Sequence, residues 1–243
     1  MEIAIVTGAS AGLGKEFAKQ IDQKFNVDEI WLIARREEKL IELSKELKTK
    51  SIPIKADLTK DIKTIRKKLQ EQKPNIKLLV NNAGFGKGGK FHKLSLEEQL
   101  SMIDLNIKAL VELTYESIKY MQPGSKIIQV ASMAGYFAIP GSAIYAATKS
   151  FVLSFSNALN CELKGITSTA VCPGPVDTEF FDVSGGKYKP KKMAKAKDVV
   201  ALALKHTEKN KWVSIYGTSM KGARVLSRLV SKKSACKLIN KLR

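Results

Sequence analysis

The sequence predicts an α/β fold, a doubly wound parallel sheet in a single domain, and three observations support this. Short apolar, β-branched runs alternate along the chain with longer segments of helical periodicity. A glycine-rich turn follows the first apolar run directly. The 243 residues have an ordinary hydrophobic fraction of 44%, and a chain of this length can bury one full core.

Strands and helices are expected to alternate from the first residues onward. Met1 to Val6 is apolar and β-branched, as a buried strand is, and apolar residues recur at helical spacing from 15 to 25. Ser95 and Glu98 are spaced to form a capping box at the start of a long helix. The remaining pattern predicts strands at 29–34, 51–56, 77–81, 126–131, 167–172 and 212–216, and helices at 37–48, 61–72, 95–121 and 142–163. No repeat or linker interrupts this body, which we assign to residues 1–217.

The composition is strongly basic, with a net charge of +19 from 42 Lys or Arg and 23 Asp or Glu. A nucleic-acid or membrane partner is one interpretation of such a charge. Only six of the 42 basic residues are arginine, however, and an AT-rich genome would encode such a Lys- and Ile-rich chain. We favour this simpler explanation for most of the chain and expect no nucleic-acid partner.

The last 35 residues differ from the body, because they hold ten Lys or Arg while no acidic residue follows Glu208. Residues 218–243 are therefore interpreted as a basic amphipathic helical extension. We expect this extension to bury Leu226, Leu229 and Leu238 against its own domain or a second subunit. A peripheral membrane helix is the alternative. The apolar positions that recur at helical spacing are Val225, Leu226, Leu229, Val230, Leu238, Ile239 and Leu242.

Several classes of protein and site are not indicated. No run of eighteen apolar residues predicts a transmembrane helix, and a strand at residue 2 leaves no room for a signal peptide. Cys161, Cys172 and Cys236 match neither a disulfide framework nor a zinc site, and His92 and His206 are isolated. We expect no metal, reduced thiols and a cytoplasmic location.

The turn after the first strand has the context of a dinucleotide site, between a strand and a helix. It reads Thr7-Gly8-Ala9-Ser10-Ala11-Gly12-Leu13-Gly14. Glycine lets backbone N–H groups approach a pyrophosphate, and a helix N-terminus favours its negative charge. The spacing departs from the standard Gly-x-Gly-x-x-Gly, and an ordinary strand-to-helix turn is the alternative. We expect cofactor contacts from Gly8, Ser10, Ala11, Gly12, Leu13 and Gly14.

A set of motifs resembles the short-chain dehydrogenase/reductase family in its short single-domain form. The set comprises Thr-Gly-x-x-x-Gly-x-Gly, Asn81-Asn82-Ala83-Gly84, Asn106, Ser132, Tyr145-x-x-x-Lys149 and Pro173-Gly174. The motifs follow the family's order, and the resemblance covers roughly the first 215 residues. It implies a Rossmann fold that binds a nicotinamide dinucleotide.

The end of the second strand, Ile33-Ala34-Arg35-Arg36, predicts NADP(H) as the cofactor. An NAD site would carry an acidic residue there, whereas two guanidinium groups suit a 2′-phosphate. Lys15 is expected to add charge, and the alternative is that Arg35 and Arg36 merely begin an exposed helix. The resemblance implies adenine contacts from Asp57 and Leu58, although Asp57 also suits a helix cap. The other cofactor contacts expected are Asn82, Ala83, Gly84, Tyr145, Lys149, Pro173, Gly174, Val176 and Thr178.

The tetrad Asn106, Ser132, Tyr145 and Lys149 is expected to perform the chemistry. Tyr145 would exchange a proton with the substrate oxygen, and Lys149, one helical turn away, would lower the pKa of the phenol. Ser132 would hold the carbonyl oxygen. By resemblance, Asn106 would hold a water that links Lys149 to solvent.

These features predict an NADP(H)-dependent oxidoreductase that interconverts a carbonyl and a secondary alcohol, assembled as a homodimer or homotetramer. Residues 179–196 would form a lid, with Gly185-Gly186 as a hinge and Phe180, Phe181 and Val183 over an apolar substrate. A hydroxysteroid, ketosteroid or other apolar ketone fits this interpretation. A keto-acyl thioester reductase is one alternative, and a non-catalytic nucleotide-sensing or nucleic-acid-binding protein is another.

Overall fold

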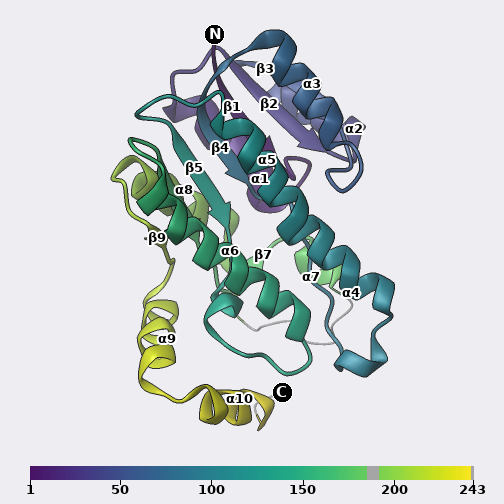
Figure 1. Cartoon of the computed structure of the whole chain (residues 1–243), viewed down its shortest axis with the longest axis vertical. Coiled ribbons are helices and arrows are strands. Elements are labelled where there is room, and N and C mark those ends of the chain that lie inside the picture. Colours follow the sequence, from purple (N-terminus) through teal and green to yellow (C-terminus); the bar gives the residue numbers. More distant parts are fainter. Residues whose placement is uncertain (185–191, 242–243) are drawn as a thin grey trace.

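A computed structural model describes residues 1–184 and 192–241 of the protein. Within them, seven parallel strands form one sheet in the order β3-β2-β1-β4-β5-β6-β9 (Figure 1). This confirms the doubly wound α/β fold. The strands are β1 (Glu2–Thr7), β2 (Glu29–Ala34), β3 (Lys50–Lys55), β4 (Asn75–Asn81), β5 (Lys126–Val130), β6 (Thr167–Val171) and β9 (Val213–Ser214).

Helices cover both faces of the sheet (Figure 1). One face packs on α1 (Gly12–Lys24), α2 (Glu37–Glu46) and α8 (Ala196–Glu208). The other packs on α3 (Ile62–Gln72), α5 (Leu110–Ile118) and α6 (Ala143–Glu162). Alternation along the strands produces these two cores, because successive side chains point to opposite faces: Ala4 and Val6 of β1 lie in one core, Ile3 and Ile5 in the other.

The chain reverses its direction of winding between β1 and β4, which lie side by side in the sheet. The connection after β1 leads to β2 on one side, and the connection after β4 leads to β5 on the other. Open α/β sheets bind ligands in a crevice outside the carboxyl ends of two such strands, and we expect the ligand crevice of this protein there. The glycine turn follows β1 and Asn82-Ala83-Gly84 follows β4, so both predicted motifs meet there.

The predicted long helix at 95–121 is interrupted. It consists of α4 (Leu96–Ile103), a π-helical segment at Asp104–Ala109, and α5. Ser95 caps α4 as expected, since its hydroxyl accepts the Glu98 N–H at 3.2 Å. The capping box is only half confirmed, because the Glu98 carboxylate accepts from the Ser95 hydroxyl at 3.3 Å instead of from its backbone.

The extension after β9 is helical, as predicted, and forms α9 (Thr218–Leu229) and α10 (Lys232–Lys241) at the bottom of Figure 1. The expectation that it buries its leucines on its own subunit is wrong. Leu226 and Leu229 are exposed because α9 turns Met220 and Ala223 toward the core instead, and Leu238 of α10 is exposed as well. Leu242 lies outside the described residues. Burial against a second subunit stays a prediction.

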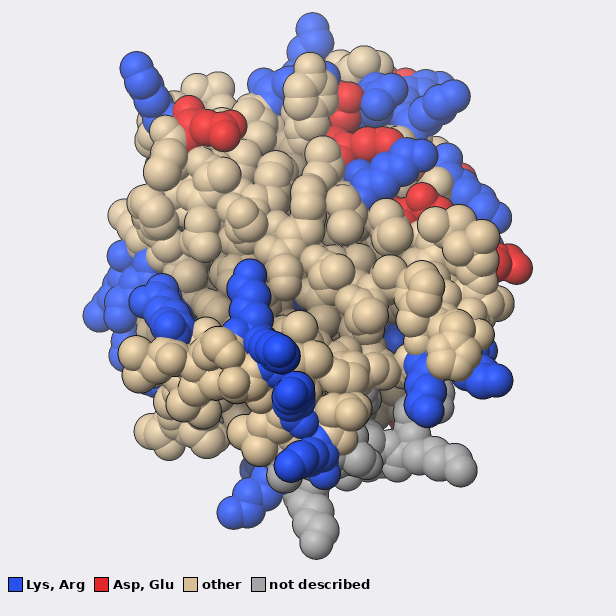
Figure 2. All heavy atoms as spheres, turned by 60° about the horizontal axis from the view of Figure 1, so that its bottom comes forward, with Lys and Arg blue, Asp and Glu red and all other residues tan. Residues whose placement is uncertain are grey.

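The surface around the extension is basic. Figure 2, which brings this end of the molecule forward, shows a row of Lys and Arg side chains crossing mostly uncharged surface. None of the helices in the described ranges combines the length and apolar character needed to cross a bilayer. The same ranges contain no cluster of His, Cys, Asp and Glu that could hold a metal ion, and all three cysteines are free thiols.

Candidate functional site

The Thr7 hydroxyl joins the two motifs at the sheet crevice. It accepts the backbone N–H groups of Asn82 at 2.9 Å and Ala83 at 3.0 Å, and it donates to Val80 O at 3.1 Å. The side-chain amide of Asn82 in turn donates a hydrogen bond to Thr7 O at 2.9 Å. The loop after β4 is therefore fixed to the end of β1, with Ala83 and Gly84 following directly.

The glycine turn has the geometry of an anion site. Gly8 has φ +64°, and a Cβ at Gly14 would collide with Gly8 O, so the turn and α1 approach more closely than side chains would allow. The N-cap residue Ala11 provides no side-chain acceptor for the first N–H groups of α1, and its first turn has no acidic residue. These N–H groups suit a pyrophosphate. Leu13 packs into the core instead, so only its backbone faces the turn.

The two arginines after β2 differ in their contacts. Arg36 reaches the glycine turn, where its Nε and one terminal nitrogen each lie 3.3 Å from the Ser10 hydroxyl. It also pairs with Glu179 at 2.8 Å. Arg35 is exposed and close enough to act on the charge of Asp57. The pair is thus more than the start of an exposed helix.

Lys15 forms an ion pair within the protein, and its expected contribution of charge at the 2′-phosphate stays a prediction. Its ammonium pairs with Glu46 of α2 at 2.9 Å, and Lys19 pairs with the same carboxylate at 2.5 Å. These two bonds lower the pKa of Glu46 to about 2. The single Glu46 carboxylate therefore balances only one of the two lysine charges in the α1–α2 pair.

Asp57 and Leu58 lie after β3, next to Arg35. Burial alone would raise the pKa of Asp57, but bonds from Thr59 and the charges of Arg35 and Lys60 hold it below its usual value. The carboxylate accepts from Thr59 N at 3.0 Å and Thr59 Oγ1 at 2.8 Å. Asp57 therefore shapes the turn that precedes α3, whose N-cap is Asp61, while Leu58 is buried.

The segment after β6 crosses the crevice. Pro173 O accepts the Met133 N–H at 2.9 Å, which ties this segment to the loop after β5. Val176 lies in the short ribbon of β7 (Val176–Asp177) and β8 (Ala194–Lys195). A Cβ at Gly12 would lie 3.2 Å from the Thr178 side chain, so Thr178 covers the glycine turn. The predicted contacts after β6 and those after β1 therefore bound one crevice.

Ser132, Tyr145 and Lys149 converge at the carboxyl end of β5. Ser132 begins the short helix η3 (Met133–Tyr136), and its hydroxyl acts on the Tyr145 phenol through a hydrogen bond. Lys149 Nζ donates to Val130 O at 2.8 Å and lies 5.9 Å from the centroid of the Tyr145 ring. A Cβ at Gly84 would lie 3.3 Å from Lys149 Nζ, so this group also reaches the loop after β4.

Asn106 joins the same cluster from the π-helical segment. Its Oδ1 accepts the Phe85 N–H at 3.0 Å, and its Nδ2 donates to Phe85 O at 2.9 Å and Thr148 Oγ1 at 3.1 Å. All four predicted tetrad residues are therefore brought together. Asparagine is a poor helix former, and here it lies in a π-helical segment of the kind that frequently occurs at functional sites.

The electrostatics of Tyr145 differ from the expectation. Burial raises the pKa of its phenol to about 12, against the hydrogen bond with Ser132, which lowers it. Burial also lowers the pKa of the Lys149 ammonium to about 8. In the described chain, desolvation thus outweighs the stabilisation that Lys149 was expected to give the phenolate. Tyr145 is therefore protonated at neutral pH.

Aromatic residues of the predicted lid lie against Tyr145. The Phe180 ring of α7 (Phe180–Val183) is 5.6 Å from the Tyr145 ring, and Phe181 is 5.7 Å from Phe180. Phe180 and Phe181 thus form an apolar wall beside the phenol. The Val183 side chain and the proposed Gly185-Gly186 hinge lie outside the described residues.

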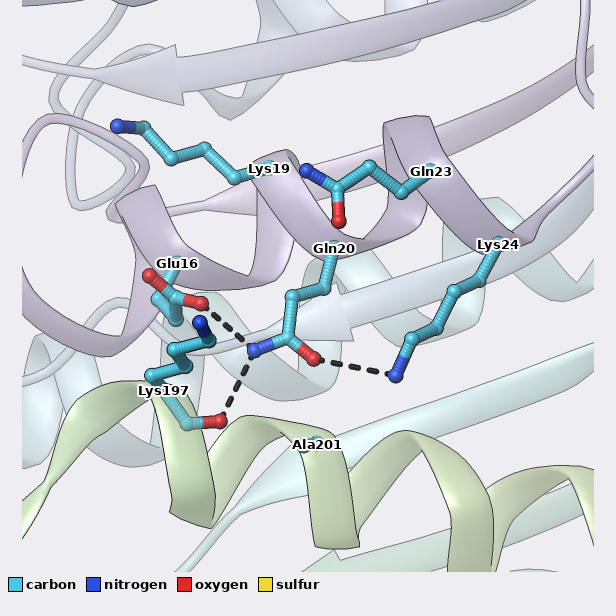
Figure 3. Close-up of a pocket in the computed structure, with 7 residues that line it drawn as sticks. All are labelled: Glu16, Lys19, Gln20, Gln23, Lys24, Lys197 and Ala201. Atoms are coloured by element: carbon cyan, nitrogen blue, oxygen red, sulfur yellow. Dashed lines mark hydrogen bonds between the residues drawn. The ribbon is translucent and has the colours of Figure 1, made fainter.

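A surface hollow between α1 and α8 is separate from this crevice (Figure 3). There the Gln20 amide donates to Glu16 at 2.6 Å and to Lys197 O at 2.9 Å, and it accepts from Lys24 at 3.4 Å. These bonds satisfy a buried amide and hold the two helices together. None of the predicted site residues lines the hollow.

Two supporting residues were missed by the sequence analysis, Thr7 and Thr148. Thr7 stood in the glycine-turn motif, but only the pairing of β1 with β4 shows that its hydroxyl serves the Asn82 loop. Thr148 Oγ1 donates to Tyr145 O at 2.8 Å and accepts from Asn106. In the sequence, its position between Tyr145 and Lys149 could have indicated this supporting role.

Comparison with known proteins shows which family the chain resembles. The sequence model described as short chain dehydrogenase matches residues 2–188. Sulfoacetaldehyde reductase 2 of Chromohalobacter salexigens is 34% identical over 198 residues, 76% of this chain and 77% of that protein. NADP-dependent 3-hydroxy acid dehydrogenase of Schizosaccharomyces pombe is 34% identical over 187 residues, 72% of each protein. The structure of a short-chain dehydrogenase from Sphingobium yanoikuyae in complex with NADPH matches with a TM-score of 0.81 at 27% identity, over 96% of this chain and 97% of that chain.

Replacing the buried Thr7 with valine should lower the free energy of unfolding by about 1–3 kcal/mol, because the part-buried Ala83 N–H loses its acceptor while the volume is kept. Urea denaturation measures this. Thr64→Val, at an exposed position of α3, is the control and should change the free energy by less than about 0.5 kcal/mol. Equal effects of the two variants would contradict the role given to Thr7.

The stability contributed by Lys149 should depend on pH. Because the folded pKa is about 8 and the usual value is 10.5, the unfolded chain binds more protons between these pH values, so stability rises with pH there. From pH 8 to pH 10, wild type should gain on the order of 1–3 kcal/mol relative to Lys149→Met. Urea denaturation of both proteins across this range measures the difference, and a constant difference would refute the buried ammonium.

Proposed function

Because the chain belongs to the short-chain dehydrogenase family, we propose that this oxidoreductase uses NADP(H) to interconvert a carbonyl and a secondary alcohol, with Tyr145 as the acid and base. The observation that carries this proposal is the convergence of Ser132, Tyr145 and Lys149 beside Gly84, at the mouth of the crevice that the glycine turn bounds. A proton donor and a dinucleotide site thus share one edge of the sheet.

Tyr145 donates its proton to the substrate oxygen during reduction and accepts one during oxidation. With a pKa of about 12 the phenol is fully protonated at neutral pH, which suits the donor role. Ser132 Oγ, hydrogen-bonded to the phenol, orients the substrate oxygen toward it. The bound dinucleotide supplies the hydride that the carbonyl carbon accepts.

Lys149 and Asn106 position the proton donor. The ammonium is anchored on Val130 O, and the Asn106 amide is anchored on Phe85 and Thr148, so neither side chain can drift away from Tyr145. A pKa near 8 lets Lys149 exchange protons with solvent at neutral pH. We assign to this pair the return of a proton to Tyr145 after each reduction.

Preference for NADP(H) is supported by the cations beside the glycine turn. Arg35 is exposed beside Asp57, and Arg36 bonds to Ser10 of the glycine turn and to Glu179, so both guanidinium groups lie near the turn that would hold the dinucleotide. The strand end offers no carboxylate to repel that phosphate. The names of two of the similar proteins specify NADP or NADPH, which agrees with this assignment.

The substrate is proposed to be an apolar ketone, a ketosteroid among them. Support comes from the apolar wall of Phe180 and Phe181 beside the phenol, which would bury apolar surface of a substrate held at Tyr145. The similar proteins are named for differing substrates, so the wall is the more direct guide.

Tyr145→Phe should reduce turnover by roughly 10²–10⁴-fold while NADPH binding changes little, because only the proton donor is removed. The assay is NADPH oxidation with a panel of apolar ketones, with binding followed separately by nucleotide fluorescence. Tyr115→Phe, at an exposed site on α5, is the matched control and should retain full activity. Activity of Tyr145→Phe within about threefold of wild type would contradict the proposed role of Tyr145 as proton donor.

Arg35→Asp should reverse the preference from NADPH to NADH, because a charge-assisted bond of about 1.5–3 kcal/mol is exchanged for repulsion of the 2′-phosphate. The ratio of kcat/KM for the two cofactors measures the preference. Lys45→Asp, a charge reversal at an exposed position of α2, serves as the control and should leave the ratio unchanged. A wild-type ratio near one would show that Arg35 selects neither cofactor.

A further inference from the structure

The two terminal helices expose an unusual amount of apolar surface. Val225 and Leu229 are 58% and 78% exposed, and Leu226 and Leu238 are about as open, at 50% and 53%. In α9, Leu229 is four residues after Val225 and three after Leu226, so the three side chains form one stripe. The opposite side of α9 uses Met220 and Ala223 to pack against the domain. Leu226 and Leu229 therefore lie away from the packed side of α9, while Val225 also lines a pocket with Val213 and Ile215 of the body.

Cations lie along one side of this stripe, and none of the residues after Glu208 is acidic. Lys221, Arg224 and Arg228 follow one flank of α9 and, with His206 and Lys211, line a pocket beside it. The buried Arg224 Nε has no hydrogen-bond partner among the described residues. Lys232, Lys233, Lys237 and Lys241 continue the charge along α10. Figure 2 shows the resulting row of basic side chains on otherwise mostly uncharged surface.

The positive charge of α9 and α10 indicates which kind of partner could cover this surface. A second copy of the chain would bring the same seven cations of α9 and α10 face to face, and like charges in contact oppose association. An anionic lipid surface matches both features, because it attracts the cations and receives the apolar side chains below its headgroups.

We propose that α9 and α10 form a docking surface for an anionic membrane. This assigns residues 218–243 a role distinct from that of the body, as a peripheral anchor that lies on the bilayer without crossing it. The docking surface consists of the apolar stripe together with the lysines and arginines of the two helices.

The docking surface adjoins the reaction site. A Cβ at Gly174, in the segment after β6, would lie 2.5 Å from Met220 Sδ of α9. Arg224 lies 5.9 Å from the Tyr136 ring, at the end of the short helix that begins after Ser132. Docking would therefore hold the segments that bound the site close to the lipid. If the proposed reductase function is correct, the substrate is a ketone dissolved in the membrane.

Sedimentation of the full-length protein with lipid vesicles tests the docking. Wild type should sediment with vesicles of phosphatidylcholine and phosphatidylserine, much less with phosphatidylcholine alone, and less as salt is raised. Lys232→Glu with Lys233→Glu should weaken binding roughly tenfold or more. The control, Lys63→Glu with Lys67→Glu at exposed positions of α3, changes the net charge equally and should bind as wild type does.

One variant and one control, each replacing an exposed apolar side chain with serine, test the role of the stripe. Leu229→Ser should weaken vesicle binding, whereas Ile41→Ser, at another exposed position on α2, should not. Equal losses in variant and control, or failure of wild type to bind anionic vesicles, would overturn the proposal. So would an oligomer in light scattering that Leu229→Ser dissociates, since a second copy would then cover the stripe.

This test does not depend on the proposed chemistry. Sedimentation needs neither cofactor nor substrate, so Tyr145→Phe should bind vesicles as wild type does. Loss of binding in Tyr145→Phe would place the docking surface elsewhere. If wild type docks but reduces no ketone, the proposed function fails while the docking surface stands.

Discussion

The Thr7 hydroxyl holds together the two strand ends on which the site depends. With one donated and two accepted hydrogen bonds it joins the end of β1 to the loop after β4. The glycine turn and Asn82-Ala83-Gly84 thereby share one crevice. Gly84 lies next to Lys149 at the edge of this crevice. A hydroxyl is suited to this place because it both donates and accepts where no water reaches.

Burial determines the chemistry that this crevice can support. Removing Tyr145 and Lys149 from water favours the neutral form of each, so the phenol keeps its proton and the ammonium gives up its proton more readily. The carbonyl of Val130 orients the lysine, and the π-helical segment places Asn106 beside it. The proposed proton donor is thus ready for reduction before a substrate binds.

The features that could be predicted from the sequence are those that short sequence patterns determine. Strand alternation, the glycine turn and the Tyr145-x-x-x-Lys149 spacing predicted a doubly wound parallel sheet and the meeting of the tetrad residues, because parallel strands end at one edge. Three features depended on tertiary packing instead. The π-helical segment results from the bonds of Asn106 to Phe85 and Thr148, the raised pKa of Tyr145 from burial, and the exposure of Leu229 from the side of α9 that meets the core.

Transfer of the C4 hydrogen from NADPH to a ketone tests the central claim most directly. The protein is incubated with an apolar ketone and NADPH that carries deuterium at both C4 positions, and the product is analysed by mass spectrometry and NMR. Our account predicts one deuterium on the carbinol carbon, and a hydroxyl proton taken from solvent through Tyr145. A protein that binds NADPH but leaves every ketone unreduced would contradict the account and favour a nucleotide-sensing role on the same fold.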